Sequence, residues 1–364
     1  MFTRRDFIKL TGSALVGSTL LSICREKHSD IDPSININNI LKDLIIKYVN
    51  SVHKELGLDN ANQEIKVLTV QEAKNRYFEL FKIIKNFQEV FEPNNNIDIS
   101  NLTLAHDSVQ KYLVSKGMFL STFMLGSDQV GATVFPLIRI YEIQPYTEAT
   151  GYSIEDCDIY KITSEFSSKV LAKNLPTFTA ATTTFNDLSA IIVVNPLQIA
   201  VDINQYKESG VVVDEQDYFA SLVKNELGNL KFNRRYEYID PNIEIKFNIR
   251  NGATFSATKL QLSEAYSDLC SFEANSSFPG HILRILLSVN DGYKVSQRLL
   301  QASILKFNQT YRSEKSLDPR LPQIIAARIY QDPKLNEELL KIVKHTFSHF
   351  FENLIFPKLD SNKI

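Results

Sequence analysis

The pattern of apolar residues changes twice along the chain, and this change restricts the fold more than any other feature. Between Ile40 and Leu56, and again between Val70 and Phe91, apolar residues recur three and four positions apart, which is the spacing of a helix with one buried face. The stretch from Ala132 to Thr147 is instead rich in β-branched and aromatic residues, as strands are. From Thr258 onward the helical pattern returns. The sequence therefore predicts an α+β fold that is mostly helical, with a small central mixed β-sheet.

Several single elements can be expected around this middle region. The run "AIIVVN", Ala190 to Asn195, fits a buried strand, and a strand-like alternation begins at Ile243. The residues from Asp214 to Lys231 fit a helix with Asp214 as its N-cap. A further helix is expected before Gly117, and the last helix runs from Asn336 to Phe356.

The composition allows a large core and argues against one class of partner. The chain has 364 residues, of which 44% are hydrophobic, and a formal net charge of −2. Such a length suits one large domain or two ordinary ones. Because there is no excess of basic residues, we expect no nucleic-acid partner.

The N-terminus reads "MFTRRDFIKLTGSALVGSTLLSIC". The segment from Thr3 to Lys9 resembles the twin-arginine export signal of bacteria, with Arg4 and Arg5 as the paired arginines. An apolar run of 14 residues follows, from Leu10 to Ile23, which is too short to span a bilayer comfortably. A basic start followed by a short apolar run is the layout of a signal peptide. The resemblance implies export by the twin-arginine (Tat) route, to the periplasm or to the outer side of a membrane.

Leu21 to Cys24, "LSIC", resembles a lipobox, the site where bacterial lipoproteins are cleaved and lipidated on cysteine. Ile23 departs from that pattern, which has a small residue at this position. Lipidation of Cys24 would tether the protein to the outer side of the inner membrane or to the outer membrane. A soluble exported protein and an uncleaved anchor stay open as alternatives. Cys157 and Cys270 could form a disulfide outside the cytoplasm, although nothing in the sequence pairs them.

The stretch "LVKNELGNLKF", Leu222 to Phe232, differs by two residues from an HExxH helix. In HExxH, two histidines four positions apart present their rings to one zinc ion, and the Glu acts as base on the metal-bound water. Asn225 and Asn229 stand at the two histidine positions, and Glu226 stands at the position of the base.

A second stretch, "LSEAYSDLCSF" from Leu262 to Phe272, resembles the second-helix motif of the gluzincin (thermolysin-like) zinc metallopeptidases. The resemblance covers Ala190 to Phe272. It implies a zincin-like core in which Glu264 stands at the third ligand position. Asp268 stands at the position of the acid that orients a ligating histidine.

The two asparagines are the main departure from the family. An amide oxygen is a poor ligand for zinc compared with an imidazole nitrogen, so we expect no cofactor, with zinc as the alternative. Glu226 would then be a vestigial base. His281, His345 and His349 are the histidines that could take over a role in such a site, although each also fits an ordinary helix.

These observations give one leading hypothesis and two alternatives. The first is an exported, membrane-tethered protein with an inactive metallopeptidase-like core that binds a peptide or protein partner. The second is an active zinc metallopeptidase with unusual ligands, and the third is a non-enzymatic helical envelope protein that binds or scaffolds. We expect five segments: a signal peptide (1–23), a tether (24–37), an N-terminal helical region (38–130), a zincin-like α+β core (131–272) and a helical C-terminal lobe (273–364).

Overall fold

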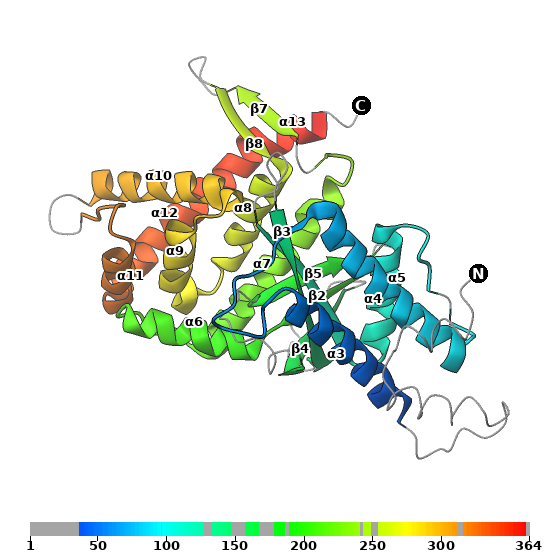
Figure 1. Ribbon diagram of the computed structural model, residues 1–364. Coiled ribbons are helices and arrows are strands. Elements are labelled where there is room, and N and C mark those ends of the chain that lie inside the picture. Colours follow the sequence, from blue (N-terminus) through cyan, green and yellow to red (C-terminus); the bar gives the residue numbers. More distant parts are fainter. Residues whose placement is uncertain are drawn as a thin grey trace. The chain divides into compact units, whose positions relative to one another are not determined.

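The computed structural model forms two compact units (Figure 1). Unit 1 comprises residues up to 144 together with 162–176, and unit 2 comprises residues 145–161 together with 177–364. The predicted export signal with Arg4 and Arg5, the lipobox cysteine Cys24 and most of the predicted tether lie outside the described residues. The structure describes residues 36–95, 97–126, 133–146, 157–166, 178–185, 189–240, 243–248, 254–311 and 316–361.

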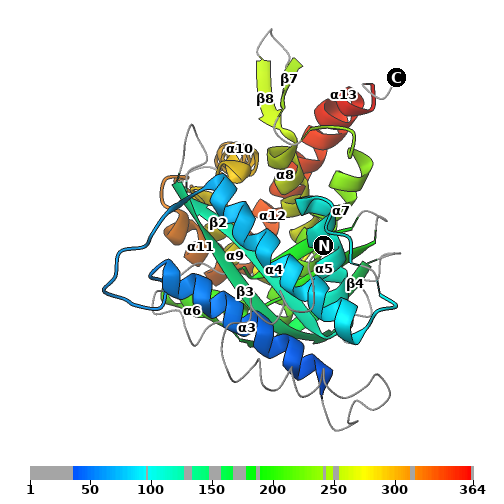
Figure 2. The same cartoon turned by 45° about the vertical axis from the view of Figure 1, so that its right-hand side comes forward.

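Three helices of unit 1 bury the apolar faces expected from the sequence. They are α3 (Ile37–Glu55), α4 (Val70–Phe91) and α5 (Leu102–Ser115). Their buried side chains form one core with side chains from two strands of the same unit. Figure 2 shows the three helices lying along these strands.

The strands of unit 1 are antiparallel. Strand β2 (Met118–Gly126) pairs along its whole length with β3 (Thr133–Pro145), and β1 (Leu68–Thr69) pairs with the start of β3. The sequence predicted β3 but not β2. Four consecutive residues at the start of β2, Met118 to Ser121, are buried, so this strand has none of the alternation that marks a half-exposed strand.

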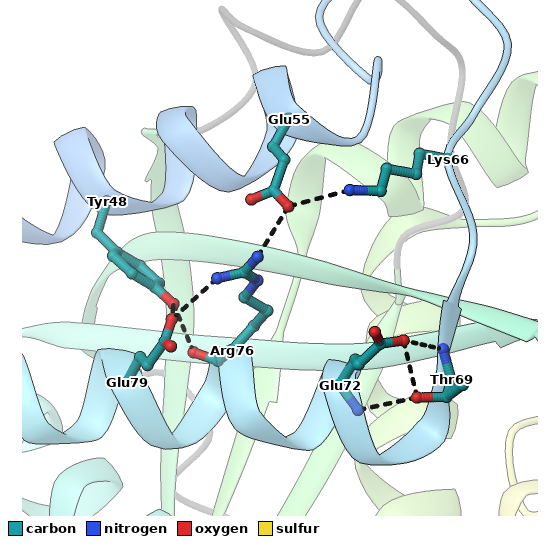
Figure 3. A network of polar contacts seen from close by, with 7 residues as sticks. All are labelled: Tyr48, Glu55, Lys66, Thr69, Glu72, Arg76 and Glu79. Carbon is teal, nitrogen blue, oxygen red and sulfur yellow. Dashed lines mark hydrogen bonds and ion pairs between the residues drawn. The ribbon is translucent and has the colours of Figure 1, made fainter.

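A polar network joins α3 to α4 on the surface of unit 1 (Figure 3). Arg76 contacts Glu55 at 2.8 Å and Glu79 at 3.2 Å, and the hydroxyl of Tyr48 donates to Glu79. Nearby, Thr69 and Glu72 form a reciprocal capping box at the start of α4. The box satisfies backbone N–H groups that have no partner inside the helix.

Unit 2 contains the part of the six-stranded sheet in which strand directions are mixed. The first half of β4 (Cys157–Glu165) belongs to this unit and pairs in parallel with β6 (Ala190–Val194), while β5 (Ala180–Thr184) pairs with β6 in antiparallel fashion. All five residues of β6 are buried. This explains why "AIIVV" reads as a continuous apolar run.

Helices make up most of the rest of unit 2. A hairpin of β7 (Glu244–Asn248) and β8 (Thr254–Thr258) projects from the helices of this unit beside α13 in both views. The helices are α6 (Pro196–Glu208), α7 (Glu215–Arg235), α8 (Lys259–Ser271), α9 (Phe278–Leu287), α10 (Lys294–Thr310), α11 (Pro322–Gln331), α12 (Pro333–Phe350) and α13 (Phe356–Ser361), with a π-helical turn at Phe351–Ile355 and 3₁₀ turns at Asn275–Ser277 and Asp291–Tyr293.

The fold class is the expected mixture of helices and strands, with helices predominating. Residues 177–364 belong to one unit. Ile192, Leu222, Leu283 and Ala326 share one apolar core, so residues on both sides of position 272 pack together. None of the described helices is long and apolar enough to cross a membrane.

Candidate functional site

The helix that carries the NELGN stretch is well defined at both ends. Asp214 caps α7 by accepting a hydrogen bond from the backbone N–H of Asp217. Acidic residues occupy the first turn, and Arg234 and Arg235 occupy the last. This arrangement complements the helix dipole, and Arg235 also forms an ion pair with Asp360 at 2.6 Å. The expected helix and its N-cap are confirmed.

Helix α8, which carries the second stretch, packs closely against α7. Thr258 and Gln261 form a capping box at its start. The two helices come nearest at Gly228, where an added Cβ would lie 2.8 Å from the Cα of Ser267 and 3.0 Å from the Sγ of Cys270. The glycine in NELGN is therefore required by the closeness of the two backbones, a packing role.

The two asparagines face α8 and use their amides there. The side-chain N–H₂ of Asn225 donates to the Oγ of Ser267 at 3.0 Å and to the Oδ1 of Asp268 at 3.3 Å. One turn later, the Oδ1 of Asn229 accepts from the Oγ of Ser263 at 2.8 Å. The structure thus brings Asn225 and Asp268 into direct contact, and Asn229 bonds to Ser263, the residue that precedes Glu264.

Glu226 contacts strand β5. Its Oε2 accepts a hydrogen bond from the Oγ1 of Thr182 at 2.6 Å. Burial raises the pKa of Glu226, while the Thr182 hydroxyl and the Arg284 guanidinium act against that rise. The carboxyl therefore holds its proton more firmly than an exposed glutamate.

Glu264 lies in the same electrostatic environment. Burial, together with the carboxyls of Asp268 and Glu226, raises the pKa of Glu264 to about 7, and Arg284 opposes this rise. Glu226 and Glu264 are thus close enough for each to disfavour ionisation of the other. Such a pair retains a proton near neutral pH.

Arg284 is the cation of this site, and the sequence reasoning missed it. It forms an ion pair with the Oδ1 of Asp268 at 2.6 Å, where Asp268 is fully buried and the Arg284 side chain is 20% exposed. Although burial opposes its charge, Tyr293, Asp268 and Tyr218 keep the pKa of Arg284 above its usual value. Its guanidinium also lies 5.7 Å from the ring centre of Tyr293, a cation–π contact.

A chain of hydroxyl groups continues from Arg284 toward the sheet. Tyr206 and Tyr218 share a hydrogen bond of 3.1 Å between their hydroxyls, and Tyr218 donates to Asp202 at 3.1 Å. Thr179, just before β5, donates to the same carboxylate oxygen of Asp202 at 3.0 Å. The network therefore connects α6, α7 and the start of β5 through polar groups.

The histidines do not join this cluster as ligands. His281 is fully buried, and one of its ring nitrogens lies 2.7 Å from the Oγ of Ser221. Burial, followed by the charge of Arg284, holds its pKa well below the usual value, so the imidazole is neutral. His345 and His349 lie on exposed positions of α12, with ring centres 6.0 Å apart, and His349 contacts Asn353.

The two cysteines of unit 2 are free thiols in the structure. Each is half-buried, and burial raises the pKa of each to about 11. A thiol with a raised pKa carries little thiolate and is a poor nucleophile. Cys157 and Cys270 are therefore poor candidates for catalysis in this state.

The donor set of the site does not fit zinc. Both asparagine amides are already engaged with α8, and a guanidinium stands among the carboxyls where a second cation would be repelled. Within the described ranges, no three or more His, Cys, Asp and Glu side chains gather to hold a metal ion. We therefore derive no chemistry through a metal.

One signal in the sequence could have revealed Arg284. Helix α9 reads "FPGHILRILL" and is otherwise almost wholly apolar, with seven of its residues buried. A single arginine in such a helix must find a buried partner. Its partner Asp268 was predicted, but from a different motif.

Neither a scan against protein-family models nor searches of curated proteins and of solved structures finds a match to this chain.

Proposed function

We propose that this chain is an exported bacterial envelope protein with a gluzincin-like core that binds an extended peptide segment of a partner without cleaving it. The observation that carries the proposal is the ion pair between Arg284 and Asp268, 2.6 Å long. Asp268 stands at the position that orients a ligating histidine in the resemblance. Here its carboxylate is used by a guanidinium and by the amide of Asn225 instead.

This arrangement supports binding over hydrolysis. A peptidase of this class needs a cation that polarises a water molecule and a carboxylate that takes its proton. A guanidinium supplies charge but has no open coordination position for water. Glu226 remains in the position of the base, but it is buried and hydrogen-bonded to Thr182. This arrangement therefore does not supply the cation that would polarise a water molecule, which is the first requirement for hydrolysis.

Strand β5 offers a surface for an extended peptide. Among the described residues it pairs only with β6. Thr179 and Phe185 direct backbone hydrogen bonds toward the β6 side, and these bonds alternate along an antiparallel pair. The backbone groups of Ala180, Thr182 and Thr184 therefore point away from β6. A peptide that adds as a further strand would bond to them and would pass the Thr182–Glu226 contact.

Metal uptake tests the proposal that the site derives from a gluzincin zinc site. We would measure zinc by elemental mass spectrometry after dialysis of the wild type and of an Asn225→His, Asn229→His, Arg284→Leu triple variant against zinc. We expect no retained zinc in the wild type and about one zinc per chain in the triple variant. The matched control adds Glu264→Gln, which should abolish the uptake because it removes the third ligand.

Two results would contradict this part of the proposal. Stoichiometric zinc in the wild type, with cleavage of an unfolded protein substrate, would establish an active peptidase. A folded triple variant that takes up no zinc would show that the three positions do not converge, and the gluzincin interpretation would fall.

Peptide binding is tested on β5. We would select binders from a library of random linear peptides and measure their affinity for wild type, Thr184→Ala and Thr184→Pro. Proline removes an N–H that points away from β6, and edge strands tolerate this, whereas alanine keeps the N–H. We expect Thr184→Pro to weaken binding about tenfold and Thr184→Ala to change it less than about twofold. Equal affinity of both variants would exclude β5 as the binding edge.

A further inference from the structure

Unit 1 contains a cavity far in sequence from the asparagine site. Its volume is about 420 Å³, and it opens among α4, α5 and β2. This volume lies in the range of small-molecule sites, roughly 300–1,000 Å³. Tyr77 and Phe81 of α4, Leu102, His106 and Asp107 of α5, and Thr122 of β2 line it.

The walls are mainly apolar and aromatic. Tyr77 and Phe81 are buried and belong to the main core of unit 1, so they form a fixed surface. The ring of His106 stands edge-on to Phe81, with centres 6.0 Å apart. Polar groups are few, and Asp107 is the only acidic side chain among the lining residues. A few polar groups in an apolar wall are what orients a ligand in such a site.

Asp107 is mostly buried but poorly paired. Its side chain is 14% exposed, and the Nδ1 of His106 lies 3.6 Å from its Oδ1. That distance is too long for a hydrogen bond. Over the described part of the chain, no other cationic side chain forms an ion pair with Asp107. The carboxylate of Asp107 can therefore accept a further cationic partner.

We infer that this cavity binds a small organic amine with an aromatic or branched apolar body. Asp107 would pair with the ammonium group, and the apolar lining that Tyr77, Phe81 and Leu102 provide would contact the body of the ligand. An anionic ligand of the same shape would meet the carboxylate of Asp107, so the charge of the lining selects against it.

The chain contains no tryptophan, which makes indole fluorescence a clean measurement. We would titrate the purified protein with tryptamine, 3-ethylindole and indole-3-propionate, which share the indole and differ in charge. Excitation at a wavelength that tyrosine does not absorb reports only the ligand. We expect tryptamine to bind with blue-shifted emission, and to bind at least tenfold more tightly than either of the other two.

Single substitutions can distinguish the contribution of the Asp107 charge to binding from the contribution of the cavity itself. Asp107→Asn should weaken tryptamine binding about tenfold and leave 3-ethylindole unchanged. Thr122→Phe, which fills the cavity, should abolish binding of both. The matched control is Asp43→Asn, an exposed carboxylate on α3, which should have no effect, and thermal unfolding checks that each variant is folded.

Three outcomes would overturn the inference. They are no binding of tryptamine to the wild type, binding of indole-3-propionate as tight as that of tryptamine, and unchanged tryptamine affinity in a folded Asp107→Asn variant. Each would show that Asp107 does not select a cationic ligand in this cavity.

Discussion

Two arginines, one in each unit, show how differently an exposed and a buried ion pair are used. Arg76 in unit 1 lies on the surface, where its side chain is 31% exposed and pairs with two glutamates that are more exposed still. Arg284 in unit 2 pairs with a fully buried aspartate and lies near two half-buried carboxyls. Unit 1 also contains a largely buried ion pair, Arg139 with Glu165 at 2.8 Å, so the contrast lies between Arg76 and Arg284, one at a surface and one between helices.

This difference raises the question of why unit 2 contains buried polar groups between α7 and α8. Replacing a buried ion pair by apolar side chains of similar size is often neutral or stabilising. The packing of α7 against α8 by itself would therefore not favour polar groups such as Asn225, Asp268 and Arg284 over apolar ones. Their presence is what we expect of a site that once had, or still has, a function beyond stability.

The largest effect should come from breaking the buried pair. Arg284→Met leaves the carboxylate of Asp268 buried without its cation, and we expect the free energy of unfolding in urea to fall by about 3–5 kcal/mol. The double variant Asp268→Leu, Arg284→Met should regain most of this loss, because Asn225 keeps its bond to Ser267. A double variant as unstable as the single one would mean that the pair itself is required for the packing of α7 and α8.

A smaller effect should follow from adding one methyl group at the helix crossing. Gly228→Ala places a Cβ 2.8 Å from the backbone of Ser267, so the helices must separate, and we expect a loss of about 2–3 kcal/mol. Gly292→Ala is the control, since its Cβ would meet only side-chain atoms, the nearest at 3.3 Å. A Gly228→Ala variant as stable as this control would show that α7 and α8 can move apart freely.

The same contrast explains what the sequence could and could not predict. The helices of unit 1 follow from regular apolar spacing, and α4 begins and ends at the predicted residues Val70 and Phe91. In α7 the expected helix and cap appear, because local capping chemistry determines them. Strands β2, β4 and β5 were not predicted.

The site was predicted only where a motif described it. Asn225 and Asp268 were singled out by two separate motifs, and the structure brings them into contact. Arg284, Asp202 and Tyr218 were missed, because they come from α9, α6 and α7 and meet only in three dimensions. No local pattern links residues that far apart in sequence.

Two buried groups, one in each unit, should contribute to stability with opposite pH dependences. Burial, with the charge of Arg139, lowers the pKa of His53 in α3 to about 4. Acidification therefore protonates the unfolded chain first, and unit 1 loses stability as the pH falls below about 6.5. Glu264, with its pKa raised to about 7, binds a proton more tightly in the folded state. The contribution of Glu264 to the stability of unit 2 is therefore lost as the pH rises from about 4.5 through about 7. The buried His281 of the same unit, whose pKa is held well below its usual value, acts in the same direction as His53 below about pH 6.5.

Hydrogen exchange, corrected for the intrinsic pH dependence, can follow the two units in the same sample. We expect α3 to lose about 1–2 kcal/mol of protection toward about pH 5, and α8 a similar amount toward about pH 8. His53→Gln should remove the first slope and Glu264→Gln the second. Slopes of the same sign in both helices would contradict the assignment to these two groups.

The smallest effect should come from the surface arginine. Arg76→Gln removes contacts of 2.8 Å to Glu55 and 3.2 Å to Glu79, but water can hydrate both carboxylates once the guanidinium is gone. We expect a loss of about 0.5 kcal/mol in urea unfolding at low salt, and almost none at about 1 M salt, where charges on the surface are screened. The loss from Arg284→Met should persist at high salt, because ions do not reach a buried carboxylate. A loss from Arg76→Gln that matched it in size and in salt response would mean that burial does not separate the two arginines.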